Sequence, residues 1–369
     1  MGMIRRRKIG RPKKIKIDYT PQEKQIEFHQ CPANELLVGG AAGGGKSHYL
    51  RMEAVTYAAR IPGLQVYLFR RTFPEIENNH IIPLLEIIPS ELALWREGKH
   101  RFEFVNGSMI KCCHAQYEKD IFIYHGDEIH LLLIDELTTF TEFQYTYLRN
   151  RVRCTLDNIP DEFRFKIPGI ICSSNPGGVG HNSVKENFVD YCRITAEEAS
   201  ARRKAKPPKK TYFKLHPVTG EKEWFGLKLA PSTKKTKKPM LRGYIPARME
   251  DNPILMERDP GYEDRVEAMP EPYRSAYREG DWEIHLGAVF QFSRAHHVIE
   301  PVAVPKGVPL YMTFDWGFAK PFSVGWWWVD SDGRLYRFAE WYGWNGTPDM
   351  GLRLTDPEIA RGIVSREKK

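Results

Sequence analysis

A glycine-rich loop that closes on Lys-Ser carries the clearest chemistry in this sequence. Residues 40–47 match the spacing Gly-x4-Gly-Lys-Ser in full, with an apolar run before them and a helical pattern after them. Such a loop turns successive backbone N–H groups toward a phosphate, at the positive end of the helix that follows. Lys46 would reach the terminal phosphates, and the Ser47 hydroxyl would ligate Mg²⁺. The predicted phosphate-binding positions are Gly40, Gly43, Gly44, Gly45, Lys46 and Ser47. These residues predict a nucleotide-binding protein.

Two adjacent acids follow a continuous apolar run at residues 130–134. An unbroken apolar run is typical of a strand that is covered on both faces, as in a parallel sheet. Asp135 is then expected to hold Mg²⁺ through water, and Glu136 is expected to polarise the water that attacks the γ-phosphate. Adjacent acids also favour the class of P-loop ATPase in which an extra strand separates the two motif strands. The run 65–69 and a hairpin at 102–112 are candidates for that insertion.

A third apolar run, 170–172, ends in Ser-Ser-Asn-Pro-Gly-Gly. Ser174 and Asn175 are candidates for the element that couples loss of the γ-phosphate to motion. The Pro and Gly residues are explained equally well by a tight turn, but Asn175 less so. Upstream of the loop, Gln22 and Gln25 are candidates for reading the adenine base, with a solvent-facing helical Gln as the alternative.

Apolar strands that alternate with helical patterns predict an α/β fold with a mostly parallel sheet. Near the other end of the chain, 311–315 reads as a strand that ends in an acid. Two antiparallel strands follow at 323–329 and 335–341, joined by a turn at 330–333.

The composition is that of an ordinary globular protein with a basic balance. The formal net charge is +8 and the pI is near 9.0, which favours a polyanionic partner without naming it. No apolar run reaches the roughly 18 residues of a membrane span, and the six cysteines show no metal-binding spacing. Residues 1–18 predict a disordered basic arm, which would contact DNA phosphates or merely aid solubility.

The motifs occur together in an order that resembles the large terminase subunit of tailed bacteriophages. The stretches that carry the resemblance are 40–47, 134–136, Ser174 to His181 and the Phe-Asp-Trp-Gly at 314–317. The resemblance implies an ATP-driven motor that moves double-stranded viral DNA into procapsids. It implies a P-loop ATPase followed by an RNase H-like nuclease that cuts concatemeric DNA.

The same resemblance implies cofactors, partners and a location. ATP and Mg²⁺ would serve the motor, and Mg²⁺ or Mn²⁺ the nuclease. The implied partners are double-stranded DNA, the portal protein, the small terminase subunit and further copies of the chain in a ring, with no membrane. The chain would act in the cytoplasm of the infected bacterial host and would not belong to the mature virion.

The expected layout is a basic arm over 1–18, an ATPase core over 19–195, a lid or linker over 196–285 and a partial nuclease domain over 286–369. Within the lid, 202–238 holds thirteen Lys or Arg against two acids and is predicted to be a flexible basic loop.

The resemblance makes Asp315 the expected first metal ligand of the nuclease, with Glu340 as an auxiliary acid. Asp330 and Asp332 are better explained by the hairpin turn. Asp356 and Glu358 lie, with Asp349, in what reads as an irregular polar segment. Because the further acids that two-metal cleavage requires are not evident, the nuclease domain looks truncated, and cleavage by this chain alone is doubtful.

Two other functional classes compete with the motor. A helicase-type remodelling ATPase would require a second RecA-like domain after residue 190, and its motifs are not evident. A phosphate-binding module without turnover is opposed by Glu136, which is useful only if water must attack. The loop has no basic residue before Lys46, so a neighbouring subunit is expected to supply the catalytic arginine. The candidates are Arg149, Arg151 and Arg153.

Overall fold

The computed structural model describes residues 17–216, 219–230, 240–284, 297–346 and 350–368. The chain divides into two compact units, Met1–Phe292 and Ser293–Lys369. The first unit contains the expected ATPase core together with the expected lid, so the lid folds with the core. Most of the predicted basic arm, and the linking stretch 285–296, lie outside the described residues.

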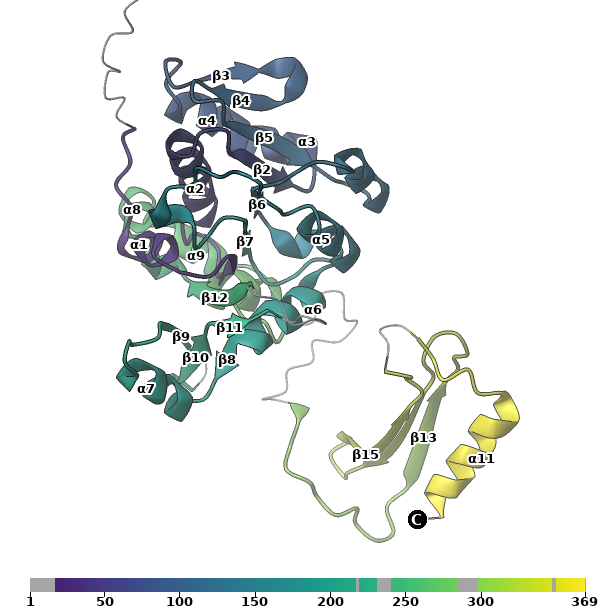
Figure 1. Ribbon diagram of the computed structural model, residues 1–369. Helices are drawn as coiled ribbons and strands as arrows, with labels where there is room; N and C mark the ends of the chain where they lie inside the picture. The colour runs from purple at the N-terminus through teal and green to yellow at the C-terminus, as the bar shows by residue number, and fades with distance from the viewer. Residues whose placement is uncertain (1–16, 217–218, 231–239, 285–296, 347–349, 369) are drawn as a thin grey trace, which may run out of the picture. The chain divides into compact units, whose positions relative to one another are not determined.

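A nine-stranded, mostly parallel sheet forms the centre of the first unit, in the order β11-β12-β1-β7-β6-β2-β5-β4-β3 (Figure 1). Five neighbouring pairs, from β12–β1 to β2–β5, are parallel. The strands are β1 (Glu35–Gly40), β2 (Gln65–Arg70), β3 (Ala93–Arg96), β4 (Arg101–Phe104), β5 (Met109–His114), β6 (Leu131–Ile134), β7 (Gly169–Ser174), β11 (Lys228–Leu229) and β12 (Leu241–Ala247). The predicted α/β class and parallel sheet are confirmed.

The strand between the two motif strands is β7, which pairs with β1 on one side and β6 on the other. The suggestion that 65–69 or the hairpin is inserted there was wrong. In chain order those strands do lie between the motifs, but β2 pairs on the far side of β6, and β4 and β5 extend the sheet beyond it. As a result, the ends of β1, β7 and β6 meet at one edge.

Helices flank this sheet (Figure 1). The fully buried residues of β1, β6 and β7 form the centre of a single large hydrophobic core beneath them. The α-helices are α1 (Glu23–His29), α2 (Lys46–Arg60), α3 (Phe73–Ile76), α4 (Ile82–Ile87), α5 (Glu142–Arg149), α6 (His181–Val184) and α7 (Ala196–Lys204). Two π-helical segments, η1 (Glu77–Ile81) and η6 (Lys185–Asp190), continue α3 and α6 respectively. Short 3₁₀ segments include η3 (Glu118–Tyr124) and η4 (Leu137–Thr139).

The segment 202–238, expected to be a flexible loop, is largely folded. The strands β8 (Arg193–Ile194), β9 (Thr211–Leu215) and β10 (Lys222–Gly226) form a small antiparallel sheet in the order β8-β10-β9. Two short runs that contain aromatic residues, with a glycine between them, are the hairpin signal that the high Lys and Arg content obscured. The lysine-containing stretch 231–239 lies outside the described residues.

The expected lid consists of α8 (Pro253–Arg258), α9 (Tyr262–Glu267) and the π-helical segment η8 (Ser275–Glu279). Its anchor is Trp282, which is 1% exposed and stacks on the His181 ring at 5.6 Å between centroids. The Trp282 indole donates to the Tyr244 hydroxyl of β12 at 3.0 Å. The end of the lid is therefore packed into the core beside β1 and β12.

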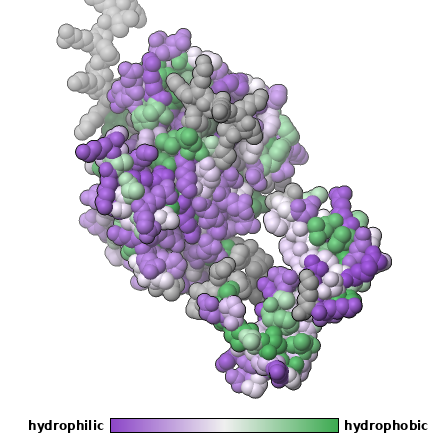
Figure 2. Space-filling view, turned by 60° about the horizontal axis from the view of Figure 1, so that its bottom comes forward, coloured by the Kyte–Doolittle hydropathy of each residue, from purple (hydrophilic) through white to green (hydrophobic). Residues whose placement is uncertain are grey.

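The second unit contains a three-stranded antiparallel sheet and one helix. The strands β13 (Leu310–Asp315), β14 (Ser323–Val329) and β15 (Leu335–Tyr342) lie in chain order, and α11 (Asp356–Glu367) packs on β14 through Ile359. These strands agree with the sequence prediction. The irregular segment predicted around Asp356 was wrong, because Thr355 and Glu358 form a capping box that starts α11, whereas Asp349 lies outside the described residues. Figure 2 shows hydrophobic residues gathered at the surface of this unit, and all six residues of β13 are exposed.

A buried ion cluster ties the neighbouring parallel strands β1 and β12 to α5 in the first unit. The Glu35 carboxylate accepts from Arg149 Nε at 2.7 Å, from Arg242 Nη2 at 2.9 Å and from the Tyr145 hydroxyl at 2.7 Å. Burial opposes ionisation, yet the two guanidinium groups hold the pKa of Glu35 below its ordinary value. Glu35 is therefore a charged residue in the core that depends on both arginines.

Candidate nucleotide-binding and hydrolysis site

The glycine-rich loop lies between β1 and α2, as the sequence predicts. Gly40 has φ +130°, and a Cβ there would lie 2.7 Å from the Ala247 carbonyl oxygen of β12. Gly45 caps α2 in the left-handed region at φ +70°. Both positions demand glycine, which gives a physical reason for the composition of the loop.

Lys46 is buried and folded back against its own loop. Its Nζ donates to the Ala41 carbonyl at 2.5 Å and to Asn175 Oδ1 at 2.7 Å. Burial lowers the pKa of Lys46, while the nearby carboxylates of Glu136 and Asp135 oppose that shift. The ammonium group lies where it bridges the loop to the end of β7.

Asp135 follows β6 and is completely buried. Its carboxylate accepts from the Ser173 hydroxyl and from His80 Nε2 at 2.9 Å, and Arg70 Nε lies 3.1 Å away. Burial acts to raise the pKa of Asp135, but His80, Arg70 and Ser173 together hold it below the ordinary value. The side chain is an anion with a fixed orientation. Its partner Arg70 is one of two arginines at the end of β2. Arg70 is therefore engaged in an ion pair within the protein.

Glu136 has φ +57°, a conformation that few residues other than glycine adopt. This turn places its carboxylate against Asn175, whose backbone N–H and Nδ2 both donate to it at 3.2 Å. Burial and the adjacent Asp135 charge raise the pKa of Glu136. A carboxylate with a raised pKa is better suited to take a proton from water.

Asn175 joins the two halves of the site, since it accepts from Lys46 and donates to Glu136. Its neighbour Ser174 bonds the Thr138 hydroxyl at 2.8 Å, and Thr138 in turn donates to the Asn175 carbonyl at 3.0 Å. The end of β7 is thus linked to the segment that follows β6. Sequence reasoning missed Thr138, for which only the run of hydroxyl residues after Glu136 was a signal.

We expect Asn175→Ala to slow hydrolysis by about 10- to 150-fold, because hydrogen bonds to charged groups contribute roughly 1.5–3 kcal/mol. The variant would leave both Lys46 and Glu136 without their shared partner. Steady-state ATPase rates measure the effect. Asn158→Ala, which removes an exposed amide outside the site, is the matched control and should retain the wild-type rate. Equal rates for the two variants would contradict the bridging role.

The two glutamines upstream of the loop occupy different environments. Gln25 is buried, and its Nε2 donates to the Gly45 carbonyl at 3.2 Å while its Oε1 accepts from the Gln22 N–H at 3.1 Å. Gln25 therefore holds the loop and is not open to a base. Gln22 lines a cleft of about 860 Å³ between α1 and α8, donates to Asn252 Oδ1 at 2.7 Å and leaves its buried Oε1 without a partner.

The lid contacts the glycine-rich loop directly. Asn252 Nδ2 donates to the Gly43 carbonyl at 2.6 Å, and the Ala42 N–H donates to the Tyr277 carbonyl at 2.7 Å. Burial raises the pKa of the Tyr277 hydroxyl, and the Glu136 charge adds to that shift. The lid segment therefore reaches both ends of the site. These residues carried no local sequence signal, because their role depends on the tertiary fold.

The three candidate arginines differ in how firmly each is held within its own chain. Arg149 binds Glu35 at the start of β1, the opposite end of the strand from the loop. Arg151 lies over the Tyr147 ring at 5.3 Å, and Arg153 donates to the Gly126 carbonyl. Arg149 is thus the poorest of the three candidates, while Arg151 and Arg153 stay predictions.

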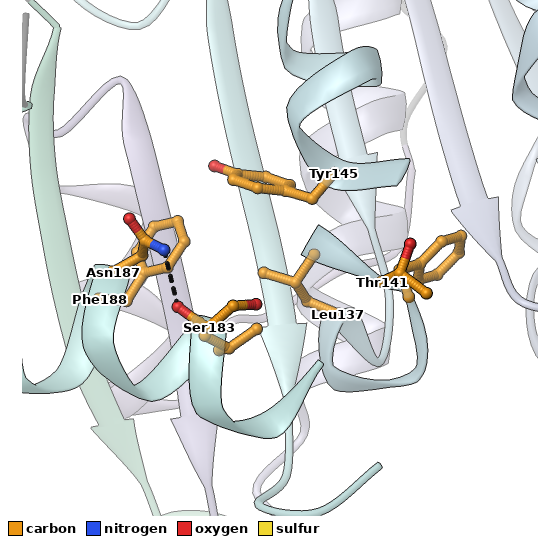
Figure 3. Close-up of a pocket in the computed structure, with 8 residues that line it drawn as sticks. Leu137, Thr141, Tyr145, Ser183, Asn187 and Phe188 are labelled. Carbon is orange, nitrogen blue, oxygen red and sulfur yellow. Dashed lines mark hydrogen bonds between the residues drawn. The ribbon is translucent and has the colours of Figure 1, made fainter. Parts of the chain in front are cut away.

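A small cavity separates the segment after β6 from the helix after β7. Its volume is about 10 Å³, enough for a single water. Figure 3 shows Leu137, Thr141 and Tyr145 facing Ser183, Asn187 and Phe188 across it, with the Asn187 amide donating to the Ser183 carbonyl at 2.9 Å.

The residues predicted for a nuclease site are only partly brought together. Asp315 and Glu340 lie on the same face of the second sheet, on β13 and β15, with β14 between them. The backbones of β13 and β15 are two strand spacings apart, which is on the order of 10 Å. Glu340 binds Arg337, and Asp330 serves the hairpin turn as expected. The described residues contain no cluster of three metal-binding side chains, so they do not fit a two-metal centre.

Comparisons with known proteins agree on one family. Residues 37–296, well over half of the chain, match the family model described as the N-terminal part of the terminase large subunit, T4-like virus type. No curated protein matches the chain.

Several solved structures resemble the fold at low identity. A large terminase from a thermophilic bacteriophage is 15% identical, with a TM-score of 0.49, over 95% of this chain and 75% of that one. The ATPase domain of the Thermus phage P74-26 large terminase is also 15% identical, with a TM-score of 0.42 over 72% and 95%. The bacteriophage HK97 large terminase is 13% identical, with a TM-score of 0.40 over 90% and 64%.

Proposed function

Since the chain belongs to the large terminase subunit family of tailed bacteriophages, whose members are DNA-packaging ATPases, we propose that it hydrolyses ATP to translocate double-stranded viral DNA. The observation that carries the proposal is the convergence of Lys46, Asn175 and Glu136 at the ends of three adjacent parallel strands. In this arrangement the side-chain amide of Asn175 lies between Lys46, the candidate phosphate-binding cation, and Glu136, the candidate general base.

Hydrolysis in this site would follow from the positions of the protein's own groups. On nucleotide binding, Lys46 would exchange Ala41 and Asn175 for the phosphate oxygens. The Asn175 side chain would then be held by Glu136 alone, and Glu136 would accept a proton from the attacking water. Loss of the γ-phosphate would return Lys46 to Asn175. The Thr138–Ser174 link and the lid contacts of Ala42 would carry that change outward.

The donor set fits Mg²⁺. The Ser47 hydroxyl makes no hydrogen bond within the described part of the chain, and Asp135 is an oriented anion at the end of β6. Oxygen ligands supplemented by water and phosphate suit Mg²⁺ better than a cage of protein side chains. Bound there, Mg²⁺ would neutralise charge on the phosphates.

Gln22 is the residue proposed to read the base. Its unpartnered Oε1 would accept from the 6-amino group of adenine, whereas guanine presents a carbonyl at that position. We expect Gln22→Ala to weaken ATP binding about 5- to 10-fold, for the loss of roughly one hydrogen bond, and to leave GTP binding unchanged. Titration of fluorescent nucleotide analogues measures both. An equal loss for ATP and GTP would count against base reading.

In this role the chain would act with double-stranded DNA, the portal protein, the small terminase subunit and further copies of itself in a ring. It would do so in the host cytoplasm during infection and would not form part of the mature virion. No helix among the described residues is long and apolar enough to cross a bilayer.

DNA-stimulated ATPase activity tests the proposal, and a forked duplex separates it from a helicase. A motor that packages duplex DNA should hydrolyse ATP faster when duplex is present and leave the fork intact. Strand separation would favour the helicase, which would need a second parallel sheet with its own motifs. Outside the first unit, the described strands form only the antiparallel sheet of β13 to β15.

A further inference from the structure

The small sheet β8-β10-β9, with α7 packed on it, presents an outward face that combines cations and aromatic rings. We call this the basic face. On β9 and β10, Phe213 pairs with Trp224, and Leu215 pairs with Lys222. Ala199 of α7 covers part of the same face through Trp224. The basic face comprises Arg203, Lys204, Lys206, Lys209, Phe213, Leu215, Lys222 and Trp224.

The cations of the basic face are not neutralised by the protein. Arg203, Lys204, Lys206, Lys209 and Lys222 are exposed, and none forms an ion pair with a carboxylate among the described residues. Other cations of the same segment form ion pairs with carboxylates of the protein. Arg202 binds Glu198 at 2.6 Å, and Lys214 lies 3.3 Å from Glu223 on the inner side. The five exposed charges remain available to an anion.

Two of these cations have fixed positions above aromatic rings. The Arg203 guanidinium lies 4.5 Å from the centroid of Trp224, and Lys222 Nζ lies 4.5 Å from the centroid of Phe213. Such contacts hold a cation in place and contribute roughly 0.5–1 kcal/mol each at exposed sites. Trp224 is buried against Ala199 and Arg203, and Lys222 lies over the ring of the more exposed Phe213, so the two rings do not form a pair of open platforms on which successive bases could stack.

We propose that the basic face binds the phosphate backbone of double-stranded DNA. The inference rests on the proposed motor function and adds to it a location for the duplex. Charge complementarity selects a polyanion. The burial of Trp224 argues against single strands, which bind largely through base stacking on exposed aromatic rings. Contacts to phosphates alone carry no sequence preference, as a motor that moves along any sequence requires.

The basic face is also connected to the nucleotide site within the first unit. Arg248 follows β12, and its Nη2 donates to the Leu215 carbonyl of β9. The backbone carbonyl of the same residue closely approaches the glycine-rich loop, where a Cβ on Gly44 would lie 3.0 Å from it. Arg248 therefore provides one direct connection between the small sheet and the glycine-rich loop.

The test measures the association constant K for duplex DNA at several salt concentrations. It compares the wild-type chain with the triple variant Lys206→Gln/Lys209→Gln/Lys222→Gln. Removing one lysine–phosphate interaction reduces the slope of log K against log salt by about 0.9, so the expected reduction for three is about 2.7. Affinity near 0.1 M salt should fall at least about tenfold, equally for unrelated sequences. Fluorescence anisotropy with a labelled duplex gives both quantities.

Lys99→Gln/Lys119→Gln/Lys306→Gln removes the same charge from exposed sites elsewhere and should retain the wild-type slope. Circular dichroism checks that both triple variants are folded. An unchanged slope in the first variant overturns the proposal while leaving the motor function intact. Wild-type duplex binding combined with a loss of self-association, measured by sedimentation, would assign the face to a protein partner and likewise overturn it. A wild-type chain that binds no duplex would instead overturn the motor function.

Discussion

Replacing Glu136 by Gln is expected to reduce ATP turnover by about 10²–10⁴-fold, the usual contribution of a general base. The amide keeps the size of the side chain and can still accept from Asn175, but it cannot take a proton from water. Nucleotide binding should persist, because Glu136 lies against Asn175 and not against the loop that holds the phosphates. The variant therefore separates hydrolysis from binding.

Single-turnover phosphate release measures the chemical step, and a fluorescent nucleotide analogue measures binding in parallel. Glu142→Gln, an exposed acid in the first turn of α5, is the matched control and should hydrolyse at the wild-type rate. Turnover by Glu136→Gln close to that of wild type would remove Glu136 from the role of base. Loss of both binding and turnover would show instead that its strained backbone supports the loop.

The second large effect concerns stability. Glu35→Gln should lower the free energy of unfolding of the first unit by about 3–5 kcal/mol, the usual cost of removing one partner from a buried ion pair. Arg242, which is 4% exposed, would lose the carboxylate that neutralises it. Arg149 would lose its only acidic partner among the residues described, and α5 would be less firmly held to β1.

The pH dependence of stability provides a second measurement. Because the pKa of Glu35 is lower in the folded chain than its ordinary value of 4.5, its contribution is fully present above about pH 4.5. That contribution is lost as the pH falls toward the folded pKa. Wild type should therefore lose stability on acidification by more than the variant does. Urea unfolding from about pH 7 to about pH 3, with exposed Glu86→Gln as the control, measures the difference. A loss below about 1 kcal/mol at neutral pH would contradict the account.

The glycine-rich loop, the Asp-Glu pair and the strands that carry them were predictable because their signals are local. A fixed spacing, a continuous apolar run and a turn signal each depend on a few neighbouring residues. The parallel sheet followed from the apolar runs, and the structure confirms it. The strand order did not follow, because β7 is inserted between β1 and β6 by pairing that no local pattern specifies.

The remaining parts of the site depend on residues that are distant in sequence. His80 binds Asp135 from 55 positions away, and Asn252 binds the loop at Gly43 from 209 positions away. A histidine on a helix or an asparagine in a turn has many common roles, so residue type alone did not single these out. Likewise, Gln25 was one of two candidates for contacting the base, and its buried side chain instead bonds the glycine-rich loop, a distinction that only packing decides.

The regions read as irregular were misjudged for a different reason. In 202–238 and at Asp356, charged residues are frequent, and net polarity was taken as a sign of disorder. The small sheet buries Tyr212, Trp224 and Phe225, and α11 begins at a capping box. In both cases the placement of a few residues mattered more than average composition.

The π-helical segments have a consequence for how this sequence can vary. Both η1, which supplies His80, and η8, which supplies Tyr277, have wider turns than an α-helix, with one more residue per hydrogen-bonded loop. Deleting a residue from such a segment would restore ordinary α geometry and rotate the following side chains by about 100°. Substitutions in these segments preserve the register, whereas single-codon deletions would redirect the very side chains that face the nucleotide site. Sequence length is therefore constrained there even where residue identity is not.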